Sequence, residues 1–132
     1  MEIAYLQHAV DNPLNQIETT SDERRGRIAK VIDRLPVEDK GGLRQKLQRY
    51  RLVEGLDDAR EGRYTRWISM RDPSRLTIGG ILVELRIGDT MELVCKNRSG
   101  MLFQFRMDEC LVFQRLTDQE MVLQAAMDLV SQ

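Results

Sequence analysis

Basic residues are concentrated in one stretch of this chain. Residues 24–51 hold ten of them against three acidic residues, which gives a net charge of +7. Cationic side chains along a helix can follow the phosphates of a nucleic acid and displace its counterions. The alternative is a solvated face, or one neutralised by the chain's own acids, because residues 1–23 carry five acids and no base. The basic residues are Arg24, Arg25, Arg27, Lys30, Arg34, Lys40, Arg44, Lys46, Arg49 and Arg51.

A second candidate site is the run 63–71, which interleaves arginines with aromatic residues. On a sheet face this combination can stack on bases and contact phosphate, or surround a methylated amine. Tyr64 and Trp67 fall on opposite faces of a regular strand, so at least one of them is expected in the core. The residues that we predict to bind nucleic acid are Arg24, Arg25, Arg27, Lys30, Arg34, Arg44, Lys46, Arg51, Arg63, Arg66 and Trp67.

Motifs for catalysis are missing from the sequence. The single histidine is His8, and there is no nucleophile elbow, phosphate-binding loop or zinc-ligand spacing. The pairs Asp57-Asp58 and Asp108-Glu109 could hold a metal or act as acid and base, but their turn-like neighbours favour solvated carboxylates. We therefore predict a protein that is not an enzyme and needs no metal or cofactor.

The length and composition of the chain limit the classes of protein to which it can belong. A chain of 132 residues is the size of one domain, and 42% hydrophobic with 31% charged residues is typical of a globular protein. No apolar run is long enough to span a membrane, and the first residues lack a secretory signal. We expect an intracellular location (cytoplasm, nucleus or virion) and not secretion. Cys95 and Cys110 are interpreted as reduced thiols, with a disulfide between them as the alternative.

Two helical patterns precede the strand-like part of the chain. Residues 1–19 have weak periodicity and are interpreted as an arm. Thr20 and Glu23 form a capping-box pattern, from which an apolar stripe runs to Leu35 before Pro36 ends it. A second helix is expected from about Leu43, using Leu47, Tyr50 and Val53 as its apolar positions.

A third helix is predicted at the other end of the sequence. Thr117 and Glu120 repeat the capping-box pattern, and the helix should run to about Val130. It has more apolar residues than one stripe can hold, so one sector should meet a partner. We expect Val122, Ala125, Ala126 and Leu129 near one face and Leu123, Met127 and Val130 around the next. The protein-binding residues that we predict are Met121, Leu123, Met127, Leu129 and Val130.

Between the helices the sequence predicts five strands. Apolar side chains alternate with period two at Ile81, Val83, Leu85 and Ile87, as in a half-buried strand. The strands are expected at about 63–71, 76–87, 90–96, 101–106 and 110–115.

This order of strands resembles the SH3-like barrel of Tudor and Sm-type modules over about residues 62–116. Gly79-Gly80 lies where the long second strand would turn a corner, and Met107-Asp108-Glu109 lies where that family places a single 3₁₀ turn. A five-stranded meander or an OB-like barrel is the alternative. The resemblance implies an α+β fold with a five-stranded SH3-like β-barrel, two N-terminal helices and one C-terminal helix. The expected division is an arm at 1–19, a basic helical segment at 20–55, and the barrel with its last helix at 56–132.

The segments 63–72, 76–83 and 108–116 are also similar to small uncharacterised proteins of large double-stranded DNA viruses. That resemblance implies a virion or nucleoprotein component. We therefore predict a non-enzymatic binding module whose partner is nucleic acid or a nucleoprotein. The alternative is a structural or assembly protein, such as a minor virion component, that docks on other protein chains or on itself through its helices.

Overall fold

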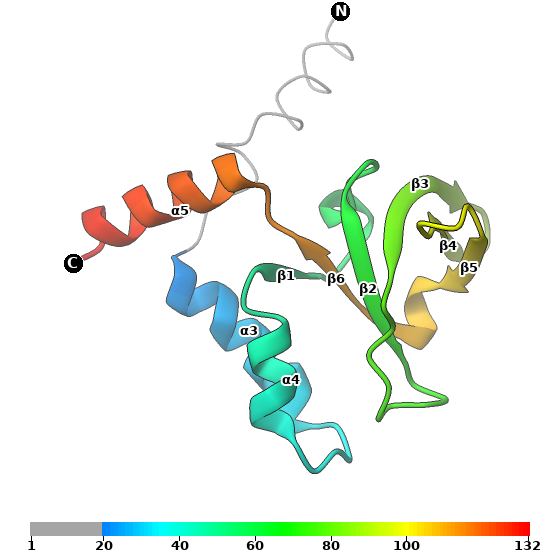
Figure 1. The fold of residues 1–132 in the computed structure, drawn as a ribbon, viewed down its shortest axis with the longest axis horizontal. Coiled ribbons are helices and arrows are strands. Elements are labelled where there is room, and N and C mark those ends of the chain that lie inside the picture. Colours follow the sequence, from blue (N-terminus) through cyan, green and yellow to red (C-terminus); the bar gives the residue numbers. More distant parts are fainter. Residues whose placement is uncertain (1–19) are drawn as a thin grey trace, which may run out of the picture.

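The computed structural model describes residues 20–132, and the predicted arm at 1–19, with His8, lies outside them. The described chain forms three α-helices, two short 3₁₀ helices and six strands (Figure 1). In chain order these are α3 (Ser21–Asp33), α4 (Lys40–Lys46), β1 (Tyr50–Val53), η1 (Leu56–Asp58), β2 (Tyr64–Ser69), β3 (Gly80–Ile87), β4 (Met91–Lys96), β5 (Leu102–Arg106), η2 (Met107–Glu109), β6 (Cys110–Arg115) and α5 (Asp118–Val130).

The strands form one antiparallel sheet in the order β1-β6-β2-β3-β4-β5. The prediction of a closed five-stranded barrel is therefore wrong: the sheet is open, has six strands, and belongs to a mixed α+β fold. Within the described residues, β5 has no strand on its outer side, so the sheet does not close. The five predicted strand runs correspond to β2–β6, and the expected 3₁₀ turn is present as η2.

The sixth strand is β1, which lies where the second predicted helix was expected to continue. The helix α4 ends at Lys46, and Tyr50–Val53 pairs with β6 instead. Tyr50 is buried towards the helices and Val53 towards the other face of the sheet. Four residues are too few for a period-two pattern to stand out, so the pairing with β6 decides this element.

The sheet curls strongly although it stays open. Trp67 on β2 stacks on Phe105 of β5, with 4.2 Å between the ring centroids. These strands are three sheet positions apart, which would separate them by roughly 14 Å in a flat sheet. The predicted long strand at 76–87 does not continue through Gly79-Gly80: β3 begins at Gly80, and Gly79 before it has a φ of +89° and lies where a Cβ would overlap the Thr65 carbonyl oxygen.

Two hydrophobic clusters lie on opposite faces of the curled sheet. The first joins α3 and α4 to the outer face around Ile68 and Phe113, and the second fills the inside of the curl around Trp67 and Leu93. Figure 1 shows α3 and α4 together on one side, away from β3, β4 and β5. The inside of the curl is thus formed by the strands together with Ala59 and with Met107 of η2, and not by the α-helices.

The predicted alternation along β3 assigns Ile81 and Val83 to the wrong face of the sheet. Leu82 is fully buried, whereas Ile81 and Val83 are exposed. A register shift between Leu82 and Glu84 marks a β-bulge, after which Leu85 joins Leu82 on the inner face. The bulge changes the period, so a strict count of alternate residues assigns the wrong face.

The helix starts predicted at Thr20 and Thr117 are confirmed, whereas α4 begins at Lys40 and not near Leu43. The Thr20 hydroxyl accepts a hydrogen bond from the Glu23 amide, and Thr117 forms a complete capping box with Glu120. The Glu120 carboxylate therefore lies at the start of α5 with its position fixed by the helix backbone.

Candidate binding surfaces

Arg24, one of the predicted nucleic-acid contacts, lies inside the molecule and is only 4% exposed. Its Nε donates to Gln124 Oε1 at 2.6 Å, and its Nη1 donates to the carbonyl oxygens of Gln48 and Tyr50 at 2.6 and 2.8 Å. Burial lowers the pKa of this guanidinium, with the neighbouring Arg25 lowering it further. Arg24 therefore joins α3, β1 and α5, and its side chain is not available to a phosphate.

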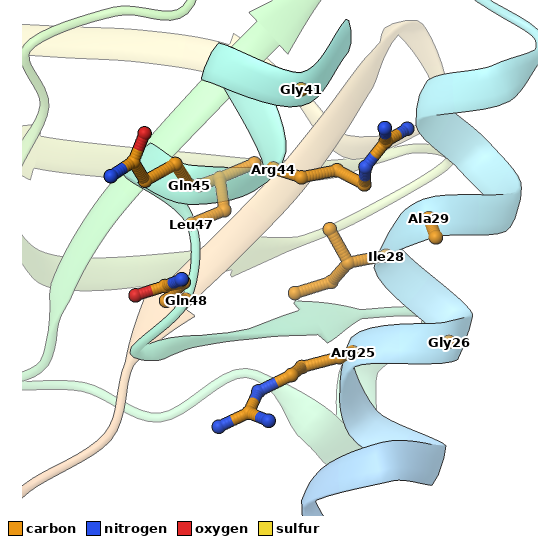
Figure 2. A pocket seen from close by; sticks show the side chains of 9 residues that line it. All are labelled: Arg25, Gly26, Ile28, Ala29, Gly41, Arg44, Gln45, Leu47 and Gln48. Atoms are coloured by element: carbon orange, nitrogen blue, oxygen red, sulfur yellow. The ribbon is translucent and has the colours of Figure 1, made fainter.

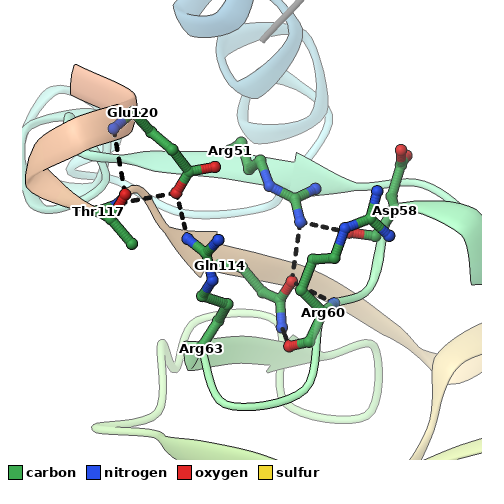
Figure 3. A network of polar contacts seen from close by, with 7 residues as sticks. All are labelled: Arg51, Asp58, Arg60, Arg63, Gln114, Thr117 and Glu120. Atoms are coloured by element: carbon green, nitrogen blue, oxygen red, sulfur yellow. Dashed lines mark hydrogen bonds and ion pairs between the residues drawn. The ribbon is translucent and has the colours of Figure 1, made fainter. Parts of the chain in front are cut away.

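Arg51 and Arg63 are used in a second internal network (Figure 3). Arg51 donates to Gln114 Oε1 at 2.9 Å and to the Asp58 carbonyl oxygen, and its pKa is lowered by burial. Gln114 is fully buried and also donates to the Arg60 carbonyl oxygen at 2.9 Å. Arg63 forms an ion pair with the buried carboxylate of Glu120. These arginines hold β1, β2, β6 and α5 together.

The remaining predicted residues of β2 are divided between the two faces of the sheet, as the alternation predicts. Tyr64 packs on the helix-side cluster, whereas Trp67 belongs to the cluster inside the curl. Arg66 is half-buried and donates through Nε to the Thr77 carbonyl oxygen at 2.7 Å. Arg63, Arg66 and Trp67 therefore do not form one common surface.

The other predicted basic residues are exposed on the helices, where a groove separates α3 from α4. Its volume is about 410 Å³. Figure 2 shows Ile28 at its centre with the side chains of Arg25 and Arg44 on either side. Arg44 also faces Asp33, with 3.4 Å between Nη1 and Oδ1. The groove could accept an apolar group that carries a negative charge.

A basic stripe lies on α3 at Arg27, Lys30 and Arg34, whose spacing of three and four residues places them on one helix face. All three are exposed, and none forms an ion pair with another residue in 20–132. Lys46 of α4 is likewise exposed without an ion pair in that range. These four cations remain available to a ligand.

A second cavity, which we call the mouth pocket, opens between β2, the 70–79 loop and the start of β5. Its volume is also about 410 Å³, within the range of small-ligand sites. Trp67 and Phe103 give it two aromatic walls, 6.3 Å apart between ring centroids. Its lining residues are Trp67, Ser69, Asp72, Arg75, Thr77, Ile78, Gly79, Asn97 and Phe103.

The lining of the mouth pocket holds one cationic and one acidic side chain, Arg75 and Asp72. Arg75 lines it, while Lys96 and Arg98 flank its Asn97 in the chain. None of these three side chains has a hydrogen bond or an ion pair with another residue in 20–132. Asp72 is the one acidic residue of the lining, and Ser74 donates to its Oδ1 at 3.1 Å. A planar apolar ligand that offers an acceptor to Arg75 and a donor to Asp72 would match this arrangement.

The loop that forms one wall of the mouth pocket is tied to the sheet. The Thr77 amide donates to the Trp67 carbonyl oxygen, and the Trp67 amide donates to Thr77 Oγ1, both at 3.0 Å. The Met70 amide donates to the Glu109 carbonyl oxygen at 2.9 Å. These hydrogen bonds hold the loop wall of the pocket in place when no ligand is bound.

The last helix, α5, is oriented with a polar face inwards. Glu120 and Gln124 are 1% and 2% exposed, whereas Val122 and Leu129 are 69% and 70% exposed. Of the predicted protein-binding residues, Leu129 and Val130 are exposed, while Met121, Leu123 and Met127 are half-buried. α5 thus presents apolar side chains to solvent.

Residues of the mouth pocket other than Trp67 were not predicted from the sequence. Phe103 falls in the predicted strand at 101–106, and Arg75 and Asn97 fall between predicted strands, but nothing in their spacing shows that the curl brings them together. Cys95 and Cys110 are free thiols, and burial raises the pKa of Cys95 to about 12. No cluster of three or more His, Cys, Asp or Glu side chains forms a metal site within the described part of the chain.

Across residues 20–132, no helix has the length and apolar character needed to cross a membrane. Comparison of the chain with models of known families, with characterised proteins and with solved structures gives no match.

Proposed function

We propose that this protein is a non-enzymatic module that binds single-stranded nucleic acid at the mouth pocket. The observation that carries the proposal is the combination of two aromatic walls, Trp67 and Phe103, with the cation Arg75 in one preformed cavity. Single-stranded nucleic acids bind where aromatic rings stack on bases and a cationic surface follows the backbone.

Phe103 is the residue on which a base would stack. Its ring is 38% exposed, whereas Trp67 is 8% exposed and is covered on one side by Phe105. A base on Phe103 would bring its backbone towards Arg75, which offers charge-assisted hydrogen bonds to phosphate. The Asp72 carboxylate could accept hydrogen bonds from amino or imino groups of the base.

The direct test is a titration with short single-stranded oligonucleotides at low and moderate salt. Trp67 is the only tryptophan, so its fluorescence reports on the mouth pocket itself. We expect Phe103→Leu, which keeps an apolar side chain but removes the ring, to weaken binding by roughly 5- to 100-fold. Arg75→Gln should weaken binding and lower the slope of log affinity against log salt by about 1.

Arg86→Gln is the matched control, because Arg86 is exposed on the same sheet but forms contacts with Glu84 and Gln104 away from the pocket. It should bind like the wild type. Absence of binding at low salt, or equal affinity of wild type and Phe103→Leu, would refute the proposal.

The basic stripe on α3 is a second candidate surface, favoured by its three exposed cations without ion pairs in the described chain. Replacing Arg27, Lys30 and Arg34 together by Glu should abolish oligonucleotide binding if the stripe is the main site. The same variant should keep the fluorescence response of Trp67 if the mouth pocket binds the bases. The triple variant alone therefore distinguishes the mouth pocket from the basic stripe as the main binding site.

A further inference from the structure

The lining of the mouth pocket holds an acid, Asp72, which is unexpected in a site for a polyanion. Asp72 is exposed, and its Oδ1 accepts from the Ser74 hydroxyl at 3.1 Å, while its Oδ2 has no hydrogen-bond partner among residues 20–132. A carboxylate repels phosphate, and so it weakens the binding of any strand unless the bound base donates hydrogen bonds to it. Asp72 therefore indicates which base the pocket accepts.

Asp72 and Arg75 lie at the two ends of one turn. The Arg75 amide donates to the Asp72 carbonyl oxygen at 3.2 Å, which closes the turn and brings the two Cα atoms to within about 7 Å. Their side chains nevertheless form no ion pair with each other or with any other residue of the described chain. A carboxylate and a guanidinium are thus neighbours in the lining, and both can form hydrogen bonds with a ligand.

Guanine is the base whose edges match this pair of side chains. Its N1–H and N2–H groups are adjacent donors, which the two oxygens of one carboxylate can accept together, and its O6 and N7 are acceptors for a guanidinium on the adjoining edge. Adenine, cytosine and thymine each place a lone pair beside their donor. A carboxylate that accepts from one of these bases therefore gains one hydrogen bond and faces a second acceptor.

We propose that the mouth pocket is selective for guanine in a single strand, an inference that rests on the proposed function. Phe103 supplies the stacking surface, and Asp72 accepts from N1 and N2 of the base. Arg75 has five N–H donors, so it can donate to O6 and also to a phosphate oxygen. Strands without guanine still bind, but more weakly, because stacking accepts every base.

Titration of the full chain with short thymine strands that differ only in their central base tests the proposal. The fluorescence of Trp67 reports binding, as in the test of the proposed function. The strand with a central guanine should bind roughly 5- to 100-fold more tightly than the strands with adenine, cytosine or thymine. A strand with central inosine, which lacks the N2 amino group, should lose most of this advantage, because Asp72 then accepts one hydrogen bond from the base and not two.

Asp72→Asn should change which base is preferred. An amide offers one acceptor and one donor side by side, which matches adenine at N6 and N7 and places a donor against a donor of guanine. The amide oxygen can still accept from the Ser74 hydroxyl, so the turn is preserved. We expect the advantage of guanine to disappear and the adenine strand to bind more tightly than it binds the wild type. Damage to the fold would not produce such a gain for one base.

Asp89→Asn is the matched control, because Asp89 is exposed in the turn between β3 and β4 and is not part of the pocket lining. It removes the same charge and should prefer guanine like the wild type. Equal affinity of the wild type for all the strands, or an advantage of guanine that survives Asp72→Asn, would overturn the selectivity and leave the mouth pocket as a non-selective site. Binding to none of the strands would instead overturn the proposed function, and this inference with it.

Discussion

Arginines have opposite roles in two regions of this molecule. At the junction of α3, β1 and α5, Arg24 is buried and its hydrogen bonds hold three elements together. At the mouth pocket, Arg75 is exposed beside Phe103 and Trp67, and its side chain has no hydrogen-bond partner in residues 20–132. The difference shows that residue type alone does not identify a binding arginine.

The contrast has a physical cause. A guanidinium taken out of water needs acceptors, and at the junction two backbone carbonyls and Gln124 supply them to Nε and Nη1 of Arg24, while its Nη2 is buried without a partner among residues 20–132. At the mouth pocket Arg75 lies on a loop that remains in water. Water can therefore accept the hydrogen bonds of its guanidinium, and no acceptor from the sheet is needed. Only the second group can exchange water for a ligand without disrupting the fold.

Replacing Arg24 should have the largest effect on stability. We expect Arg24→Ala to lower the free energy of unfolding by about 3 kcal/mol, because three hydrogen bonds of a buried guanidinium are lost. The carbonyl oxygens of Tyr50 and Gln48 lose this donor, and Gln124, which also accepts from the Ser21 hydroxyl, loses one of its donors. Urea unfolding measures this change. Arg27→Ala, an exposed neighbour on the same helix, should change stability by less than about 0.5 kcal/mol. Equal stability of Arg24→Ala and Arg27→Ala would contradict the structural role of Arg24. An Arg75→Ala variant as unstable as Arg24→Ala would show that Arg75 is structural too.

Gly79→Ala tests whether the chain conformation forms the mouth pocket. Gly79 has a φ of +89°, and an added Cβ would overlap the Thr65 carbonyl oxygen. We expect a loss of about 2 kcal/mol from the strained backbone and the displaced neighbour, together with weaker oligonucleotide binding. Gly88→Ala is the control, since a Cβ there meets no atom within 4 Å. Equal melting temperatures of the two variants would show that the bend does not depend on Gly79.

Phe105→Leu, compared with Phe103→Leu, tests which aromatic residue near the mouth pocket is structural and which one binds the ligand. Phe105 stacks on Trp67, and an aromatic pair of this kind contributes about 1 kcal/mol beyond its buried area. The variant should lose about that much stability and show altered Trp67 emission. Phe103→Leu should instead mainly lose oligonucleotide affinity. If the two variants changed stability and affinity in the same proportions, Phe103 would have no separate binding role.

Asp128→Asn should give the smallest effect, visible as a change in pH dependence. Hydrogen bonds from the Ser21 hydroxyl and amide hold the pKa of the Asp128 carboxyl below its usual range. A lowered pKa stabilises the fold above the unfolded-state pKa of about 3.9, and this contribution is lost as the pH falls through the folded-state pKa. Wild type should therefore be more stable than Asp128→Asn at pH 6, and the difference should shrink towards pH 3. A difference that is constant over this range would exclude the ionised carboxylate as its source.

Local chemistry in the sequence determined the caps, the bend and most of the strands. Thr20 and Thr117 start helices because their hydroxyls accept hydrogen bonds from the backbone of the first turn. Gly79-Gly80 marks the bend because only glycine fits the backbone conformation and the close approach. These features depend on a few neighbouring residues, and so they can be predicted without the rest of the fold.

Tertiary structure decided the features that depend on distant partners. The strand β1 exists because β6 offers it a free edge, and the same edge pairing makes a six-stranded open sheet where the sequence predicted a five-stranded barrel. Arg24 is buried because Gln124, one hundred residues later, accepts its hydrogen bond. The mouth pocket exists because the curl brings Phe103 to Trp67. Sequence periodicity shows which face of an element is apolar, but it does not show which face will be buried. In α5 the polar residues Glu120 and Gln124 are buried because they bind Arg63 and Arg24.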